Sequence, residues 1–131
     1  EALRKAGVEP LSVGRVIVAT REPWEDAVLQ VIHKLGIEYH IIFNKGAVMI
    51  LPSTVSKATG LKAALKELQI PAANVAGIGD AENDHAFLDS CGFSAAVANA
   101  VPSLKKHVHL VTRGENGEGV VEMVERVMRE A

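Results

Sequence analysis

The sequence has only one cysteine, Cys91, among its 131 residues. One thiol cannot form an internal disulfide, and a chain of this kind fits a reducing compartment, so we expect a cytoplasmic protein. No apolar run approaches the roughly 20 residues that a membrane-spanning helix needs, and the first residues do not resemble a signal peptide. These absences exclude a disulfide-rich secreted module and predict no association with a membrane.

The sequence also lacks an excess of charge of either sign. Its 14 basic and 16 acidic residues give a formal net charge of -2. Binding to nucleic acid or to an anionic membrane surface depends on a basic surface, so we expect neither kind of partner. A hydrophobic content of 48% and a charged content of 23% are ordinary for a soluble globular chain. The length suffices for one domain or for parts of two.

Strand-like and helix-like segments alternate along the chain. Runs rich in β-branched and apolar residues predict strands, and apolar residues at helical spacing predict the helices between them. The expected strands are 13–20, 38–43, 47–51, 74–78, 93–98 and 108–112, and the expected helices are 1–7, 23–36, 57–69, 83–91, a short one from Pro102, and 117–130. Strands separated by helices of these lengths favour an α/β fold with a parallel sheet.

The strongest chemical signal is the run at residues 79–84 (GDAEND). It follows an apolar strand, so Asp80 should lie at the carboxyl end of that strand, where open α/β sheets bind ligands. Asp84 falls in the first turn of the next helix and can face the same crevice. Carboxylates and water are the ligands that Mg²⁺ prefers. A D-x-x-x-D spacing at a helix start also serves as a simple cap, but its place after a buried strand favours a metal site.

Lys57 is the second candidate residue. It lies at the start of an expected helix, and one helix and one turn separate it from Asp80. Most lysines are only solvated, but neighbouring parallel strands would bring these two residues to one edge of the sheet. An ammonium group fixed there can balance phosphate and carboxylate charge, as phosphoryl transfer requires.

These residues, in this order, resemble the second half of a Cof-type phosphatase of the haloacid dehalogenase superfamily. The similarity covers about residues 52–131 and includes Lys57 with Gly60-Leu61, GDAEND at 79–84, ANA at 98–100, VT at 111–112 and GV at 119–120. The resemblance implies that Lys57 steadies an aspartyl nucleophile and the phosphoryl group. It implies that Asp80 binds Mg²⁺ directly, that Asp84 completes the metal site, and that Asn83 and Asn99 support phosphate binding.

Members of this family begin with a D-x-D-G-T-like run whose first aspartate attacks phosphorus. The four aspartates here, Asp26, Asp80, Asp84 and Asp89, form no such run, so no residue of this chain is expected to be the nucleophile. Because the first residue is Glu1, we interpret the chain as the C-terminal part of a longer polypeptide that would be inactive alone. Residues 1–53 then resemble the end of an α/β cap, and residues 54–131 the C-terminal half of a Rossmann-like core.

The expected function is hydrolysis of a phosphate monoester, such as a phosphosugar or another small phosphorylated metabolite. Polar residues of the cap, Lys45 among them, can bind that substrate or simply form turns. Two alternatives remain open: a capless sugar-acid phosphatase with Thr20 as a phosphate ligand, or a module that binds Mg²⁺ without turnover. His107 and His109 share a face of a short strand, but two histidines without a third ligand do not predict zinc. Strand edges left unpaired in half a core predict a homodimer.

Overall fold

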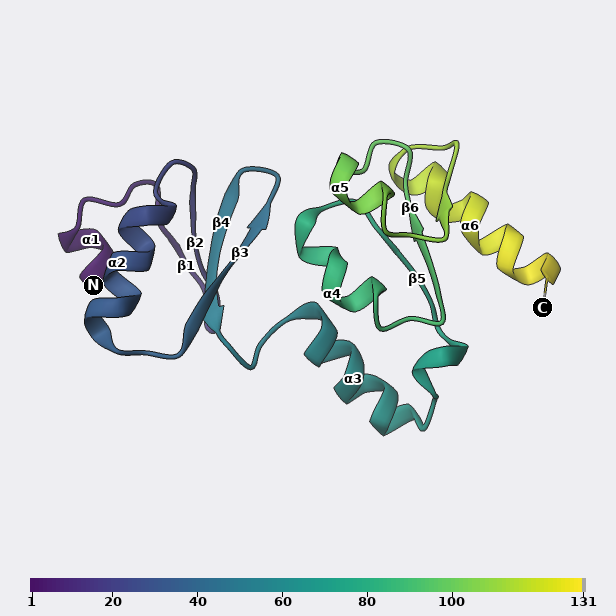
Figure 1. Ribbon diagram of the computed structural model, residues 1–131, viewed down its shortest axis with the longest axis horizontal. Helices are drawn as coiled ribbons and strands as arrows, with labels where there is room; N and C mark the ends of the chain where they lie inside the picture. The colour runs from purple at the N-terminus through teal and green to yellow at the C-terminus, as the bar shows by residue number, and fades with distance from the viewer. Residues whose placement is uncertain (131) are drawn as a thin grey trace. The chain divides into compact units, whose positions relative to one another are not determined.

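A computed structural model describes residues 1–130, which form two compact units, residues 1–56 and 57–130 (Figure 1). The division falls at the end of the short polar segment 52–56 that joins the last strand of the first unit to the first helix of the second. Both units combine helices with a sheet, as the alternating pattern predicts. The identification of the two units as cap and core stays a prediction.

The first unit is built on a four-stranded antiparallel sheet. The strand order is β1-β2-β4-β3, and one face of β4 carries the buried residues Val48 and Ile50. Val28 in the helix 25–35 and Val8 in the loop after the first helix are also fully buried. The elements are α1 (Ala2–Lys5), β1 (Ser12–Val13), β2 (Val18–Arg21), α2 (Glu25–Leu35), β3 (Tyr39–Asn44) and β4 (Ala47–Pro52).

One predicted strand of the first unit is wrong. Residues 13–20 were expected to form a single strand, but they form the end of β1, a turn, and most of β2, which pair antiparallel with Val13 opposite Val18. The turn is closed by the N–H of Gly14, which donates to the carbonyl of Ile17 at 2.9 Å. Gly14 was the only turn-forming residue in an otherwise β-branched run, so the sequence pattern concealed the reversal.

A tight turn joins β3 to β4, in the gap between the strands expected at 38–43 and 47–51. Lys45 and Gly46 form the two-residue loop, with φ angles of 47° and 84°. Positive φ at both central residues is typical of the tight hairpin turns whose twist matches that of the strands. The turn places Lys45 at the tip of the hairpin.

The second unit contains a three-stranded parallel sheet in the order β5-β6-β7, which confirms the parallel sheet expected from the sequence. Gly79 pairs with Ala96, and Ala96 pairs with Val111, so the carboxyl ends of all three strands meet at one edge. The elements are α3 (Lys57–Leu68), η1 (Ala72–Asn74), β5 (Ala76–Gly79), η2 (Glu82–Asp84), α4 (His85–Leu88), β6 (Phe93–Ala96), α5 (Pro102–Lys105), β7 (Leu110–Val111) and α6 (Asn116–Glu130).

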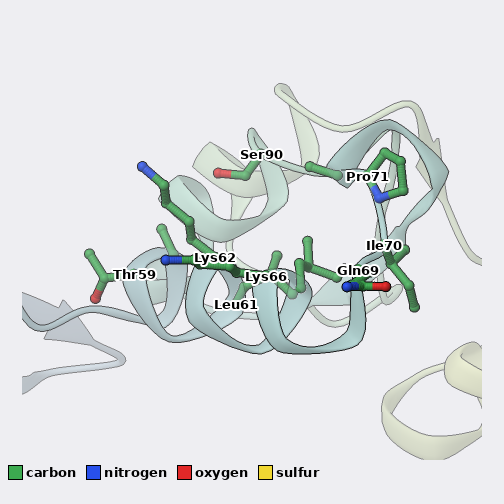
Figure 2. A pocket seen from close by; sticks show the side chains of 11 residues that line it. Thr59, Leu61, Lys62, Lys66, Gln69, Ile70, Pro71 and Ser90 are labelled. Carbon is green, nitrogen blue, oxygen red and sulfur yellow. The ribbon is translucent and has the colours of Figure 1, made fainter.

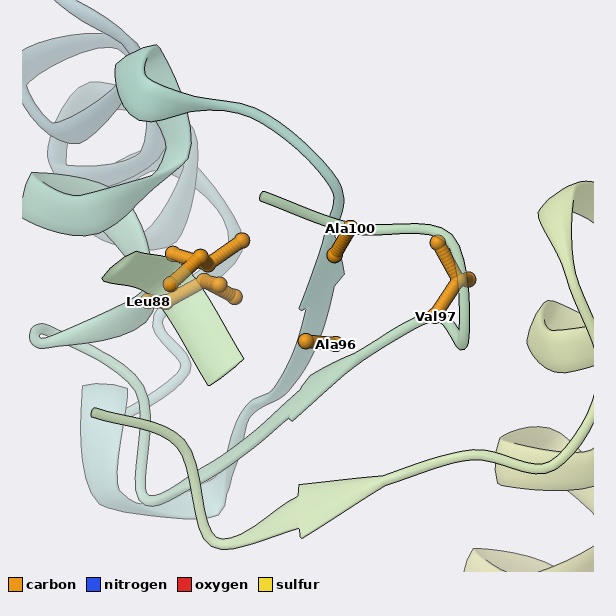
Figure 3. Packing of buried hydrophobic residues seen from close by; sticks show 5 residues of the cluster. Leu88, Ala96, Val97 and Ala100 are labelled. Atoms are coloured by element: carbon orange, nitrogen blue, oxygen red, sulfur yellow. The ribbon is translucent and has the colours of Figure 1, made fainter. Parts of the chain in front are cut away.

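Small side chains let the elements of the second unit pack closely. Figure 3 shows Leu88 of α4 beside Ala96 of β6, with Val97 and Ala100 in the loop that follows. Leu104 of α5 completes this cluster and is fully buried. The helix expected at 83–91 is shorter than predicted, because a 3-10 turn over the acidic loop precedes a single turn of α-helix. The core thus lies directly under the loops that follow β5 and β6.

A histidine side chain extends the sheet beyond its backbone ladder. The N–H of Ser94 in β6 donates to Nδ1 of His109 at 3.1 Å, while the N–H of His109 donates to the Ser94 carbonyl at 3.0 Å. The His109 ring also stacks on Phe93, with 5.6 Å between ring centroids. The imidazole therefore takes the place of a carbonyl acceptor just before β7 begins.

The outer edge of β5 pairs with no strand in the described part of the chain. Exposed apolar residues also lie along α6, among them Val121, Val124 and Met128. The homodimer predicted through strand edges stays a prediction, which size-exclusion chromatography with light scattering would test. Within residues 1–130, no helix is both long and apolar enough to cross a bilayer.

Candidate active site

The site is organised around the carboxylate of Asp84, which is only 2% exposed. Its Oδ2 accepts the backbone N–H groups of Asp80 at 2.8 Å and Ala81 at 3.1 Å, so the side chain closes the acidic loop on itself. This arrangement requires glycine at position 79, because a Cβ there would lie 2.6 Å from Asp84 Oδ2. Gly79 therefore allows the Asp84 side chain to pack closely against the end of β5.

Lys57 meets the same carboxylate from the start of α3. Its ammonium donates to Asp84 Oδ1 and forms an ion pair with it, and it lies 3.4 Å from the Asn83 side-chain oxygen. The Lys57 side chain is 49% exposed, whereas the Asp84 side chain is 3% exposed. The structure thus brings together Lys57, Asn83 and Asp84, three of the predicted site residues, with the ammonium at the boundary between protein and solvent.

The pKa of Asp84 reflects this environment. Burial is the largest single influence and raises the pKa, but the hydrogen bond from Lys57, the two backbone N–H bonds and the Lys57 charge together lower it below its ordinary value. Asp84 is therefore ionised at neutral pH. Oδ2 accepts two hydrogen bonds and Oδ1 accepts one, which leaves one lone pair on Oδ1 for a further partner such as water.

Asp80 lies at the carboxyl end of β5, as predicted, and is half-buried. Its carbonyl accepts the N–H of Val101 at 2.9 Å, which ties the acidic loop to the loop after β6. Asp80 lines a cavity of about 210 Å³ at this edge of the sheet, together with Ile78, Gly79, Val97, Asn116 and Val120. The cavity thus lies at the same edge of the sheet as the acidic loop that carries Asp84.

Asn99 does not meet the Lys57–Asp84 pair; its amide binds Asn116 instead. Asn99 Nδ2 donates to Asn116 Oδ1 at 2.9 Å, and the N–H of Asn116 donates to Asn99 Oδ1 at 3.1 Å. Sequence reasoning missed Asn116. Its position just before the expected helix at 117–130 was a signal, since asparagine is favoured at helix starts.

Lys45 lies in the first unit, where it lines a pocket of about 520 Å³ with Arg21 and Thr20. Thr20 is 6% exposed, and its hydroxyl donates to the Pro10 carbonyl at 2.6 Å. Thr20 also lies within the antiparallel sheet rather than at the end of a parallel strand. This placement does not support Thr20 as a phosphate ligand.

No three acidic, histidine or cysteine side chains lie close enough together in residues 1–130 to form a complete metal cage. His85 and His107 contact each other through their rings, with centroids 5.3 Å apart, and His85 lies 3.4 Å from the Ser103 hydroxyl. His109 binds Ser94. The histidines thus make structural contacts with protein groups.

A larger groove of about 610 Å³ lies along α3, and none of Lys57, Asp80 and Asp84 lines it. Figure 2 shows Lys62 and Lys66 on the helix side, with Ser90 and Pro71 across from the helix and Ile70 beside Gln69 at its C-terminal end. Its lining includes no acidic side chain and none of the predicted site residues. The candidate site is therefore chosen by the convergence of charged groups at the sheet edge and not by cavity volume.

A parallel sheet whose carboxyl edge holds an acidic loop, paired with a lysine from the preceding helix, defines a hydrolase-like α/β core. Residues 8–124 match the family model of haloacid dehalogenase-like hydrolases. The chain therefore belongs to this family, and the resemblance to its Cof-type members is confirmed.

Curated relatives include phosphoglycolate phosphatase from Methanothermobacter thermautotrophicus, 34% identical over 96% of this chain and 56% of that protein. Phosphoglycolate phosphatase 2 from Saccharolobus solfataricus is 35% identical over 89% of this chain and 49% of that protein. The chain thus spans about half the length of these relatives. Sucrose-phosphatase from Synechocystis, solved with sucrose and phosphate, shares the fold with a TM-score of 0.74 at 18% identity, covering 95% of this chain and 60% of that one.

Proposed function

We propose that the protein hydrolyses phosphate monoesters of small metabolites in a Mg²⁺-dependent reaction through an aspartyl-phosphate. The observation that carries this proposal is the buried Asp84 carboxylate, held by two backbone N–H groups and by Lys57 at the carboxyl edge of a parallel sheet. Such a fixed, charged constellation costs little reorganisation during a reaction. Residues 1–131 contain no D-x-D run, so the attacking aspartate belongs to no residue of this chain.

Lys57 and Asp84 have different roles in this proposal. Asp84 holds the Lys57 ammonium in place, and the half-exposed side chain leaves the ammonium able to reach a ligand oxygen. An ammonium at that position stabilises negative charge that develops on a transferring phosphoryl group. Lys57 is therefore the proposed catalytic cation, and Asp84 its anchor. Asn83, 3.4 Å from the ammonium, is proposed to support phosphate binding.

The donor set fits Mg²⁺ in part. Asp80 would hold the ion directly, and the remaining lone pair of Asp84 Oδ1 would bind a water of its hydration shell, since Mg²⁺ usually keeps several waters and binds one or two carboxylates. The described residues offer no third acidic or histidine ligand nearby, so phosphate or groups from elsewhere would complete the coordination. When bound, the ion would neutralise charge on the phosphate oxygens.

The relatives suggest which substrates to test first. Two are named phosphoglycolate phosphatases, and a structural neighbour is a sucrose-phosphatase. Phosphoglycolate and sugar phosphates are both small phosphate monoesters. Lys45, at the hairpin tip of the first unit beside a pocket, is proposed to contact the non-reacting part of such a substrate.

The test is hydrolysis of p-nitrophenyl phosphate and phosphoglycolate, with and without Mg²⁺. It compares three proteins. The first is the 131-residue chain, the second is the complete product of the gene that encodes it, and the third is an Asp80→Ala variant of that complete product. We expect Mg²⁺-dependent turnover by the complete gene product, its loss in Asp80→Ala, and no turnover by the 131-residue chain. Asp89→Ala, an exposed residue at the far end of α4, is the matched control and should retain activity. Turnover that survives Asp80→Ala would contradict the proposal.

A module that binds Mg²⁺ without turnover remains the second candidate, because the two carboxylates lie in a chain without the expected nucleophile. Titration calorimetry distinguishes the two. Mg²⁺ binding that is lost in Asp80→Ala, together with no hydrolysis by the complete gene product, would favour the binding module.

A further inference from the structure

The hydrogen bonds fix the orientation of both amides in the Asn99–Asn116 pair. A backbone N–H can only donate, so the Asn99 atom 3.1 Å from the Asn116 nitrogen is Oδ1. Nδ2 of Asn99 therefore faces the other side chain, and the atom that accepts from it at 2.9 Å is Asn116 Oδ1. The Nδ2 group of Asn116 is consequently turned away from Asn99, and none of the hydrogen bonds found in the described part of the chain uses it.

Asn116 lines the same cavity of about 210 Å³ as Asp80. Of the residues that line this cavity within the described chain, Asp80 and Asn116 alone have polar side chains; the others are glycine, valine and isoleucine. The cavity thus combines one carboxylate with one neutral N–H donor. An amide N–H can donate to a phosphate oxygen without adding charge to the cavity.

The loops that carry the pair are tied together. The N–H of Ala98 donates to the Gly114 carbonyl at 3.0 Å, so the two loops are joined on the other side of the pair. The backbone N–H groups of Arg113 and Gly114 donate to Glu122 Oε2 at 2.8 and 3.0 Å, which fixes the loop to the second turn of α6. Asn116 itself has a φ of 47°, a conformation that asparagine tolerates better than most residues. The Asn116 amide therefore has a defined position before any ligand arrives.

We propose that Asn116 Nδ2 donates a hydrogen bond to an oxygen of a phosphate group held beside Asp80. Asn99 is then a positioning residue, since its two hydrogen bonds fix the Asn116 side chain, which lines this cavity. This inference rests on the proposed phosphate chemistry of the site and adds one residue that binds the phosphate group.

The test is binding of inorganic phosphate, measured by titration calorimetry with Mg²⁺ on the complete gene product. Asn116→Asp keeps the oxygen that accepts from Asn99 but removes the donor. Loss of a hydrogen bond to a charged group should raise the Kd for phosphate roughly ten-fold or more. A purely structural role for Asn116 predicts no such loss, because aspartate is as good as asparagine at a helix start and favours the helix dipole.

Gly117→Asp controls for the added negative charge. A Cβ at Gly117 meets no atom within 4 Å, and this substitution places a carboxylate one residue further along α6. We expect it to change the Kd no more than about three-fold, as befits an exposed charge. An equal loss in Gly117→Asp and Asn116→Asp would attribute the effect to charge and overturn the proposal.

Asn99→Asp tests the positioning role through a double-mutant cycle. It keeps the acceptor for the Asn116 N–H and removes the bond that orients the Asn116 amide. Alone it should weaken phosphate binding, but in an Asn116→Ala background it should add little, because the donor is already lost and no second carboxylate faces the one at position 99. Additive losses would overturn the positioning role.

The binding measurements test the role of Asn116 independently of turnover. A wild-type protein that binds no phosphate, or an Asn116→Asp variant that binds it as tightly as wild type, overturns the role of Asn116. Phosphate binding that depends on Asn116 in a protein that hydrolyses no monoester would instead refute the proposed function and leave this inference intact.

Discussion

The second unit holds its polar side chains by backbone groups, whereas the first unit presents them at a hairpin tip and pocket rim. Asp84 is 2% exposed and accepts two loop N–H groups and an ammonium. Lys45 sits in a two-residue turn next to a surface pocket of about 520 Å³. The hydrogen bonds around Asp84 fix atoms to within fractions of an ångström, as bond rearrangement needs. The exposed turn at Lys45 tolerates side-chain replacement, as recognition of varied substrates needs.

Removal of Lys57 should have the largest effect. Lys57→Ala deletes the proposed catalytic cation and leaves the buried Asp84 without its ion pair. We expect activity to fall roughly 100-fold or more. The free energy of unfolding should fall by about 1–2 kcal/mol, less than for a fully buried pair because the Lys57 side chain is 49% exposed.

Steady-state kinetics and urea unfolding of the complete gene product measure both quantities. Lys62→Ala, an exposed lysine on the next turn of α3, is the control and should leave activity unchanged. Comparable activity in Lys57→Ala and wild type would remove Lys57 from the mechanism.

Gly79→Ala tests how closely the Asp84 side chain packs against the backbone of the second unit. The new Cβ would lie 2.6–2.7 Å from three atoms of the Asp84 side chain, so the carboxylate must shift. We expect a loss of about 1–3 kcal/mol in the free energy of unfolding, together with reduced activity. Gly60→Ala in α3 meets no atom within 4 Å and should instead stabilise the helix by up to about 1 kcal/mol. Urea unfolding of the two variants should thus give opposite signs; equal signs would contradict the close approach.

The pH dependence of stability tests the Asp84 carboxylate. Its pKa is lowered on folding, so the stabilisation is fully present above the unfolded-state value of about 3.9 and is lost as pH falls through the folded pKa. Asp84→Asn should be less stable than wild type at pH 7, and the difference should narrow below about pH 4. A difference that stays constant from pH 7 to pH 3 would show that the charge of Asp84 contributes nothing.

Lys45→Asn should have the smallest effect on the fold. Asparagine accepts the positive φ of this turn position, so the free energy of unfolding should change by no more than about 0.5 kcal/mol. If Lys45 contacts the substrate, KM for phosphoglycolate should rise a few-fold while kcat stays unchanged. An unchanged KM would mean that Lys45 serves only the turn.

Local sequence patterns predicted the elements that carry strong local signals. The helix expected at 23–36 ends at Leu35 with Gly36 as its C-cap, and the acidic loop follows β5, as the sequence indicated. The reversal between β1 and β2 was missed, because strand pairing and not local propensity decides where a β-branched run folds back.

The site shows the same division between local and long-range information. The GDAEND run identifies Asp80 and Asp84 from neighbouring residues alone. The partner of Asn99 lies 17 residues along the chain, and no local pattern specifies an amide pair across that distance. The Asp84–Lys57 pair spans 27 residues and was foreseen only as two groups at one sheet edge. Which oxygen each donor takes depends on the three-dimensional path of the loop.

The bond between Ser94 and His109 has a spectroscopic consequence. Because Nδ1 accepts a backbone N–H, the neutral ring must carry its proton on Nε2. The ¹⁵N chemical shifts of the two ring nitrogens differ between tautomers, so one labelled histidine reports whether β6 and the segment before β7 remain joined. His109 is thus a built-in probe for opening at that end of the sheet, readable in solution without any substitution.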